Sequence, residues 1–155
     1  MDVRSKDRSP QVLADACANA MWAEDRASQG LGMTVERVAP GEATLAMVVR
    51  ADMTNGHGIC HGGFIFTLAD SAFAFACNTY DQRTVAQHCA VTFLRPGRLA
   101  DRLIARAVER SRTGRSGIYD VTVTNATGDV IAEFRGHSRT ISGALLDAGS
   151  GTATA

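Results

Sequence analysis

The feature that most limits how this chain can fold is the segment from Phe64 to Cys77, FIFTLADSAFAFAC, which is apolar on nearly every side of a helical wheel. A helix with this pattern has no polar face to turn toward water, so other parts of the protein must cover it on all sides. The segment is only 14 residues long and carries Asp70 near its middle, whereas a membrane span needs about 20 apolar residues. It therefore predicts a helix buried inside a globular fold, and no membrane-spanning segment.

The rest of the chain supplies that cover mainly as strands. Strand-like runs between turn signals predict six strands, at Leu31–Val38, Glu42–Arg50, Thr84–Leu94, Arg102–Thr113, Ile118–Thr124 and Val130–Thr140. Consecutive strands joined by short turns favour an antiparallel sheet, and one sheet with one wholly apolar helix suggests that the sheet curls around the helix. The predicted fold class is α+β, with a further Ala-rich helix from Gln11 to about Ser28.

Size and composition limit the organisation and the partners. A chain of 155 residues, 45% of them hydrophobic, is expected to form one domain with its own core. We expect this domain at residues 11–142, between a flexible N-terminus at 1–10 and a disordered tail at 143–155. Sixteen Lys and Arg residues balance sixteen Asp and Glu residues, so neither nucleic acid nor a membrane surface is the expected partner.

The cysteines indicate the compartment. Four cysteines lie far apart without a CxxC pair, and the N-terminal sequence MDVRSKDRSP is too charged for a secretory signal peptide. Free thiols in a reducing, cytoplasmic environment are the expectation.

Asp70 is the first candidate for chemistry. It is the only acidic residue between Asp52 and Asp81, and it lies midway along the predicted buried helix. An unpaired buried carboxylate costs several kcal/mol, so it is paired, protonated or functional. Its alternatives are a structural cap for a neighbouring loop and a contact at a subunit interface.

Two adjacent glycines, Gly62 and Gly63, are the second candidate. They precede the apolar segment directly, where the first amide groups of a helix have no partner within the helix. Such amides, at the positive end of the helix dipole, can stabilise a carbonyl oxygen that gains negative charge. The alternative is an ordinary turn into the helix.

The spacing of these two candidates has a geometric consequence. Gly62 and Asp70 are eight residues apart, which places them roughly 12 Å apart along a helix that rises 1.5 Å per residue. A reacting carbonyl must lie within roughly 3 Å of its oxyanion donors and close to the attacking group. If both residues act on one substrate, they must come from different subunits of a homodimer.

The loop Met53–Gly63, MTNGHGICHGG, holds weaker candidates. Asn55 could bind a carbonyl or a water, or simply form the turn of its TNG sequence. His57 and His61 have the i, i+4 spacing of a metal pair, but such a pair needs a helix and the surrounding glycines oppose one, so no metal site is expected. Cys60 is expected to be packing rather than a nucleophile.

Three arginines, Arg110, Arg112 and Arg115, cluster around a predicted turn between two strands. They are either a solvated turn or a contact for phosphate, to which guanidinium groups are suited. No GxxxxGK[ST] or GxGxxG motif is present, which opposes a nucleotide site of the P-loop or Rossmann type.

Together these segments resemble a known family. The stretch NGHGICHGGFIFTLADSAFAFACN, followed by VTFLRPG, GIYDVTVTN and VIAEFRGHSRTI, is similar to the hotdog-fold thioesterases. The similarity is greatest to the phenylacetate-degradation, PaaI-type branch of the 4-hydroxybenzoyl-CoA thioesterase superfamily. It covers roughly residues 31–141 and rests on the ordered motif N-x5-HGG-x6-D. The resemblance implies a curled antiparallel sheet around a long helix.

The resemblance also implies roles for single residues. Asp70 matches the catalytic acid, a general base or a nucleophile, and Gly62 matches the backbone amide that polarises the thioester carbonyl. Asn55 matches a residue that holds the carbonyl or the attacking water, and His61 one that supports the loop. Substrate contacts are expected at Gly63, and coenzyme A contacts at Arg95 or Arg115.

The implied activity is hydrolysis of aryl-acyl-CoA thioesters, such as phenylacetyl-CoA or hydroxyphenylacetyl-CoA, without a cofactor other than the CoA of the substrate. The implied assembly is a dimer that shares its sites between subunits and pairs further into a tetramer. An aryl pocket could use the aromatic side chains of the central segment, which could equally be plain core: Phe64, Phe66, Phe73, Phe75 and Tyr80.

Two other functions remain open. A hotdog hydratase or dehydratase would carry an HFPG-like or D-x-N-P-x-H run, and neither occurs here. A non-catalytic acyl-CoA sensor would have little use for Asp70, and the chain has no room for an attached DNA-binding domain.

Overall fold

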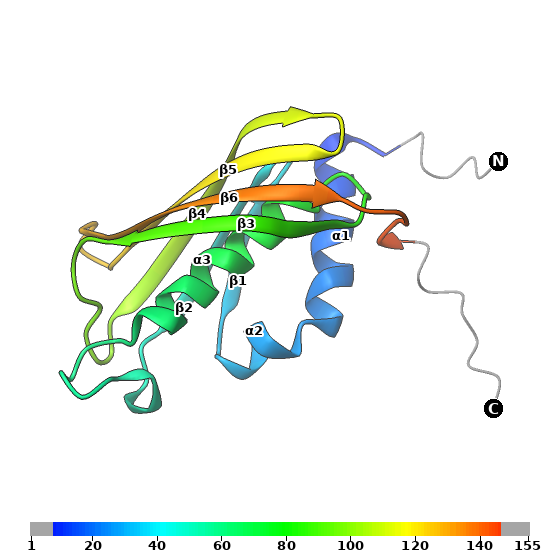
Figure 1. Ribbon diagram of the computed structural model, residues 1–155. Helices are drawn as coiled ribbons and strands as arrows, with labels where there is room; N and C mark the ends of the chain where they lie inside the picture. Colours follow the sequence, from blue (N-terminus) through cyan, green and yellow to red (C-terminus); the bar gives the residue numbers. More distant parts are fainter. Residues whose placement is uncertain (1–7, 147–155) are drawn as a thin grey trace, which may run out of the picture.

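The computed structural model describes residues 8–146 (Figure 1). Its helical elements are α1 (Pro10–Glu24), α2 (Arg26–Gly30), the 3-10 turn η2 (Ala51–Met53) and α3 (Gly62–Cys77). Its strands are β1 (Thr34–Ala39), β2 (Glu42–Val48), β3 (Thr84–Phe93), β4 (Arg102–Thr113), β5 (Ser116–Thr124) and β6 (Val130–Thr140).

The strands form one antiparallel sheet in the order β1-β2-β4-β5-β6-β3. Hairpins connect β1 to β2, β4 to β5 and β5 to β6, whereas α3 carries the chain from β2 across to β3 at the opposite edge. The sheet curls around α3, as Figure 1 shows. The predicted α+β architecture is therefore confirmed.

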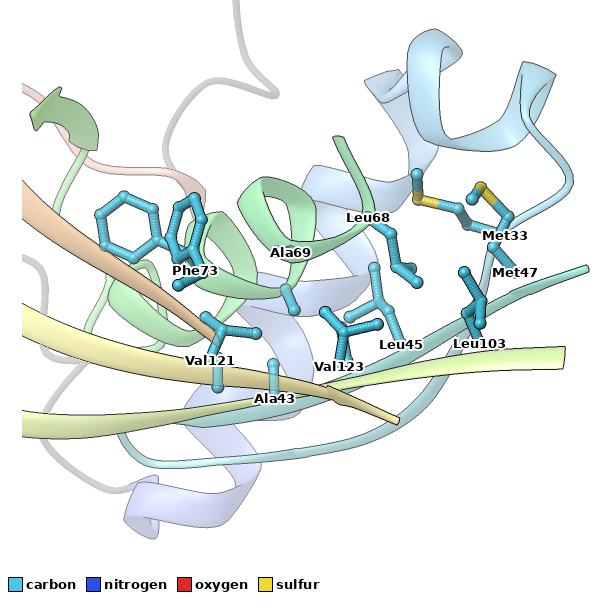
Figure 2. Packing of buried hydrophobic residues seen from close by; sticks show 14 of the residues in the cluster. Met33, Ala43, Leu45, Met47, Leu68, Ala69, Phe73, Leu103, Val121 and Val123 are labelled. Carbon is cyan, nitrogen blue, oxygen red and sulfur yellow. The ribbon is translucent and has the colours of Figure 1, made fainter. Parts of the chain in front are cut away.

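The core lies between α3 and the concave face of the sheet (Figure 2). Leu68, Ala69 and Phe73 on α3 are fully buried against Val121 and Val123 of β5. The alternation predicted for β5 is correct, because the neighbouring residues Asp120 and Thr122 point to the other face of the sheet. Of the aromatic residues that could line a pocket, Phe73 and Phe75 are core, while Phe64, Phe66 and Tyr80 are only half-buried.

One face of α3 is less covered than its sequence predicts. Thr67, Asp70, Ser71 and Ala74 are only half-buried, and their spacing of three and four residues places them on one side of the helix. The apolar pattern predicted a helix covered on every side, and one copy of the chain does not cover this side. The helix also ends at Cys77, with Asn78 as its C-cap.

The predicted helix Gln11–Ser28 is in fact two helices, which meet at Asp25. The Asp25 carboxylate accepts hydrogen bonds from the amide and the hydroxyl of Ser28, at 3.0 and 2.7 Å, and so caps α2. The buried Ser28 hydroxyl also lies 2.9 Å from that of Ser71 and ties α2 to α3.

The ends of the domain fall partly outside the described residues. Of the expected flexible N-terminus, residues 1–7 lie outside them, and Pro10 begins α1. Of the expected disordered tail, residues 147–155 lie outside them. Residues 143–146 differ from the expectation, because the amides of Leu145 and Leu146 donate to the Asp81 carboxylate.

The close approach of α3 to β6 predicts that Gly136 tolerates no side chain. An added Cβ would lie 2.7 Å from a ring carbon of the buried Phe73, and overpacking of this kind costs about 1–3 kcal/mol. We expect Gly136→Ala to lower the melting temperature by several degrees, at about 2–4 °C per kcal/mol for a domain of this size. Thermal unfolding followed by circular dichroism measures the change. Gly30→Ala is the control, since its Cβ would meet no atom within 4 Å; equal melting temperatures for the two variants would contradict the packing argument.

Candidate active site

The N-terminus of α3 presents one uncommitted backbone amide. His61 is the N-cap, and its Nδ1 accepts a hydrogen bond of 2.9 Å from the Gly63 amide. The Phe64 amide donates to the His61 carbonyl at 3.0 Å. Within residues 8–146, the Gly62 amide has no hydrogen-bond partner. The local structure therefore leaves the Gly62 N–H free at the positive end of the helix dipole.

The position of Gly62 leaves little space for a side chain. An added Cβ would lie 2.8 Å from the ring of Phe93, which comes from the end of β3. The absence of a side chain thus lets the aromatic ring pack closely against Gly62.

The loop before α3 is shaped by Asn55. Its side-chain oxygen accepts hydrogen bonds from the amides of His57 and Ile59, at 2.9 and 3.4 Å, so the turn expected for the TNG sequence is present. Asn55 also lines a cavity of about 500 Å³ together with Gly62 and Phe93. The turn engages its oxygen and leaves its amide group available to a molecule in the cavity.

Asp70 lies two turns further along α3 and is half-buried. Burial raises the pKa of its carboxyl group, and a hydrogen bond from the Cys89 thiol, at 3.9 Å, acts in the opposite direction. Among the described residues no Lys, Arg or His forms a salt bridge with it. A carboxylate of raised pKa in a half-covered position is suited to accept a proton.

The acid and the free amide do not meet within one chain. Asp70 does not line the cavity that contains Gly62, in agreement with a separation of roughly 12 Å along the helix. Both nevertheless face the same strand, because β3 provides Cys89 beside Asp70 and Phe93 beside Gly62.

Comparison with known proteins identifies the family. Residues 57–132 match the family model described as "Thioesterase superfamily". The chain is 41% identical over 128 residues to acyl-coenzyme A thioesterase PaaI of Escherichia coli, which covers 83% of this chain and 91% of that protein. The chain belongs to the thioesterase superfamily.

Solved structures agree with this assignment. The E. coli PaaI structure superposes with a TM-score of 0.86 at 40% identity, over 88% of this chain and 99% of that one. A mutant of the phenylacetic acid degradation protein PaaI from Thermus thermophilus superposes with a TM-score of 0.73 at 42% identity, over 76% of this chain and 100% of that one. The hotdog fold and the PaaI likeness are therefore confirmed, and the protein is an enzyme that hydrolyses thioesters.

The structure also places three weaker candidates of the loop, Cys60, His57 and His61. Cys60 is buried, which raises the pKa of its thiol and keeps it protonated. His57 is exposed on the loop, and His61 is engaged as the helix cap. In the part of the chain that the structure describes, no group of three or more His, Cys, Asp or Glu residues could hold a metal ion.

The arginines separate into two groups. Arg110 pairs with Asp120 at 2.8 Å, and the Arg112 guanidinium lies 3.6 Å from the centre of the Tyr80 ring, so both have partners within the chain. Arg115 donates to the Thr140 carbonyl, at the end of the sheet away from Gly62. Arg95 lines the cavity beside Gly62, and its guanidinium donates to the Val130 carbonyl at 3.1 Å.

Cys89 and Phe93 are the two residues at the site that sequence reasoning missed. Both lie in the predicted strand Thr84–Leu94, four residues apart and hence on one face. The strand's apolar character predicted a strand, and nothing in it indicated which residues would lie against Asp70 and Gly62. Among the described residues, no helix is both long and apolar enough to cross a membrane.

Proposed function

We propose that this thioesterase hydrolyses aryl-acyl-CoA thioesters, of the phenylacetyl or hydroxyphenylacetyl type, to the free acid and coenzyme A. The observation that carries the proposal is the combination of a free Gly62 amide and a half-buried Asp70 carboxylate facing one exposed edge strand. The 41% identity to acyl-coenzyme A thioesterase PaaI supports acyl-CoA as the substrate class.

We propose that the enzyme acts as a homodimer that pairs across β3. This strand bonds to β6 on one side and is the edge of the sheet on the other. Proteins protect an edge strand from pairing with charged side chains and with proline. The sequence of β3, TVAQHCAVTF, contains no Lys, Arg, Asp, Glu or Pro. The half-buried face of α3 that carries Asp70 lies against the same edge.

Such pairing would bring the two halves of the site together. Two antiparallel copies of β3 related by a twofold axis near Val91 would place Cys89 of one strand opposite Phe93 of the other. Because Cys89 contacts Asp70 and Phe93 contacts Gly62, the acid of one subunit then lies beside the amide of the other. Further pairing of two dimers into a tetramer is also part of the proposal.

The chemistry needs a base, an oxyanion donor and little else. Water attacks the thioester carbon while Asp70 accepts its proton, and the carbonyl oxygen becomes an oxyanion bound by the Gly62 N–H. The tetrahedral intermediate then breaks its carbon–sulfur bond, and the CoA thiolate leaves and takes up the proton. In the covalent alternative, Asp70 attacks the carbon, CoA leaves, and water hydrolyses the resulting anhydride.

The neighbouring residues receive supporting roles. Asn55 would donate its amide to the carbonyl oxygen or the attacking water, and His61 would keep the Gly63 amide occupied so that Gly62 remains the free donor. Gly63 would then contact substrate only through its backbone atoms other than the N–H. Arg95 beside the cavity or Arg115 at the far hairpin would contact the phosphates of coenzyme A. No cofactor is required, and a cytoplasmic location is proposed, where acyl-CoA is made and used.

The acyl group is predicted from the lining of the cavity. Ile59, Ile65, Phe93 and Leu94 give it apolar walls next to the Gly62 amide, and a planar aryl group can stack on an aromatic ring. We expect phenylacetyl-CoA and hydroxyphenylacetyl-CoA to be hydrolysed with a higher kcat/KM than straight-chain acyl-CoA, about 10-fold or more. Release of free thiol from a panel that includes benzoyl-CoA measures this. Preference for a straight-chain substrate would reject the aryl assignment, and binding without turnover of any member would favour the sensor function.

A further inference from the structure

We propose that Cys89 is a positioning residue, whose thiol donates a hydrogen bond to Asp70 and holds the carboxylate ionised and oriented for proton transfer. This inference rests on the role proposed above for Asp70. The sulfur lies 3.9 Å from Oδ1 of Asp70, at the long end of the range for a thiol donor. Among residues 8–146 it is the one side chain hydrogen bonded to that carboxylate.

The contact joins two elements rather than two neighbours in sequence. Asp70 is on α3 and Cys89 is on β3, so the thiol reaches the carboxylate across the gap between the helix and the edge strand. A bulge at Gln87 shifts the register of β3 against β6. Because one extra residue reverses which side chains face inward, this bulge decides that Cys89 is among the residues facing α3.

The charges around Asp70 indicate the direction of the effect. Burial raises the pKa of Asp70, and the Cys89 hydrogen bond lowers it. The titratable groups that interact with Asp70 in the described chain are Cys89 on β3 and Cys77 further along α3. Burial first, and then the nearby Asp70, raises the pKa of Cys89 to about 11, and burial raises the pKa of Cys77 to about 12. Both thiols are therefore protonated and neutral at pH 7.

The protonated state determines what Cys89 can do. A thiol that keeps its hydrogen is a permanent donor, so it favours the ionised form of the carboxylate at every pH at which the enzyme works. A thiolate beside a carboxylate is disfavoured, which excludes Cys89 as the covalent nucleophile. The remaining role is to offset part of the effect of burial on Asp70 and to fix the orientation of its oxygens.

The test is the pH dependence of kcat/KM for Cys89→Ala and Cys89→Ser in the full-length protein, with phenylacetyl-CoA as substrate. A general base acts only when deprotonated, so activity is present above its pKa and falls as the pH drops through it. Removing the donor raises the pKa of Asp70, and we expect the acidic limb of the Cys89→Ala profile to move to higher pH by about half a unit. Serine is a stronger hydrogen-bond donor than cysteine. Cys89→Ser is therefore expected to keep the acidic limb at its wild-type position or to move it to lower pH.

Two further measurements separate the possible failures. Cys17→Ala removes a buried thiol in α1 and is expected to leave the acidic limb of the pH profile in place. If Cys89 had a structural role alone, Cys89→Ala would change the melting temperature of the protein and not the position of that limb. The carboxyl 13C resonance of Asp70, identified by its loss in Asp70→Asn, reports the same pKa without turnover. Coinciding profiles for wild type and Cys89→Ala would overturn the inference. An active Asp70→Asn enzyme would instead overturn the proposed function.

Discussion

Asp70→Asn is expected to lower kcat/KM by about 10²–10⁴-fold, the contribution of a well-placed general base. The amide has nearly the same shape as the carboxylate, but it can neither accept the proton of water nor attack a thioester. Because burial disfavours the charged form of Asp70, its replacement by a neutral amide is not expected to destabilise the fold. Thiol release and thermal unfolding, measured on the same preparation, test both parts of the prediction.

A matched variant distinguishes this effect from a general loss of negative charge. Glu24 is exposed at the end of α1, far along the chain from α3, and Glu24→Gln makes the same change of carboxylate to amide. We expect this variant to keep wild-type activity. Substantial turnover by Asp70→Asn would require another base. A single turnover in 18O-labelled water tests the two roles of Asp70. Label in its carboxyl group would show covalent catalysis with water attack on the Asp70 carbon, because a general base takes no oxygen from water; attack on the acyl carbon puts the label in the product in either role.

The fold was largely predictable, because its elements follow from local patterns. Alternation along β5 and the continuous apolar run of α3 determine which side chains face the core. The break at Asp25 was missed because the capping signal, an acid three residues before Ser28, lies inside an Ala-rich run with high helix propensity. The half-buried side of α3 was missed for a different reason. An apolar pattern predicts that a helix face is buried, but it does not show whether the same chain or another chain buries it.

The candidate site was predictable only in part. Asn55, His61, Gly62 and Asp70 lie in one short motif, so their sequence spacing approximates their spatial arrangement. Cys89 joins them only through the sheet, and its inward orientation depends on a bulge that the sequence of β3 does not reveal. Residues brought to a site by strand register cannot be read from a single sequence, whereas residues within one loop and helix can.

The second large effect is expected when two inactive variants are combined. Gly62→Pro removes the free amide hydrogen, and loss of one oxyanion donor costs about 10²–10³-fold in kcat. The helix should accept this change, because Gly62 is the first residue of α3, where proline is favoured. His61 already has the extended backbone that a residue before proline prefers, with φ −60° and ψ 133°. Gly62→Ala is the matched control, since it adds the same Cβ beside Phe93 and keeps the N–H.

Gly62→Pro and Asp70→Asn should therefore complement each other if each site uses the amide of one subunit and the acid of the other. In a dimer with one variant of each kind, one of the two sites pairs an intact Gly62 with an intact Asp70. Random mixing of equal amounts makes about a quarter of all sites intact, by the symmetry of a twofold interface. Co-expression of the two variants is thus expected to restore roughly a quarter of wild-type activity, and assembly of dimers into tetramers does not change this fraction. A site contained in one subunit would show no recovery, because every subunit would carry one of the two defects, and activity would stay at the mean of the two variants.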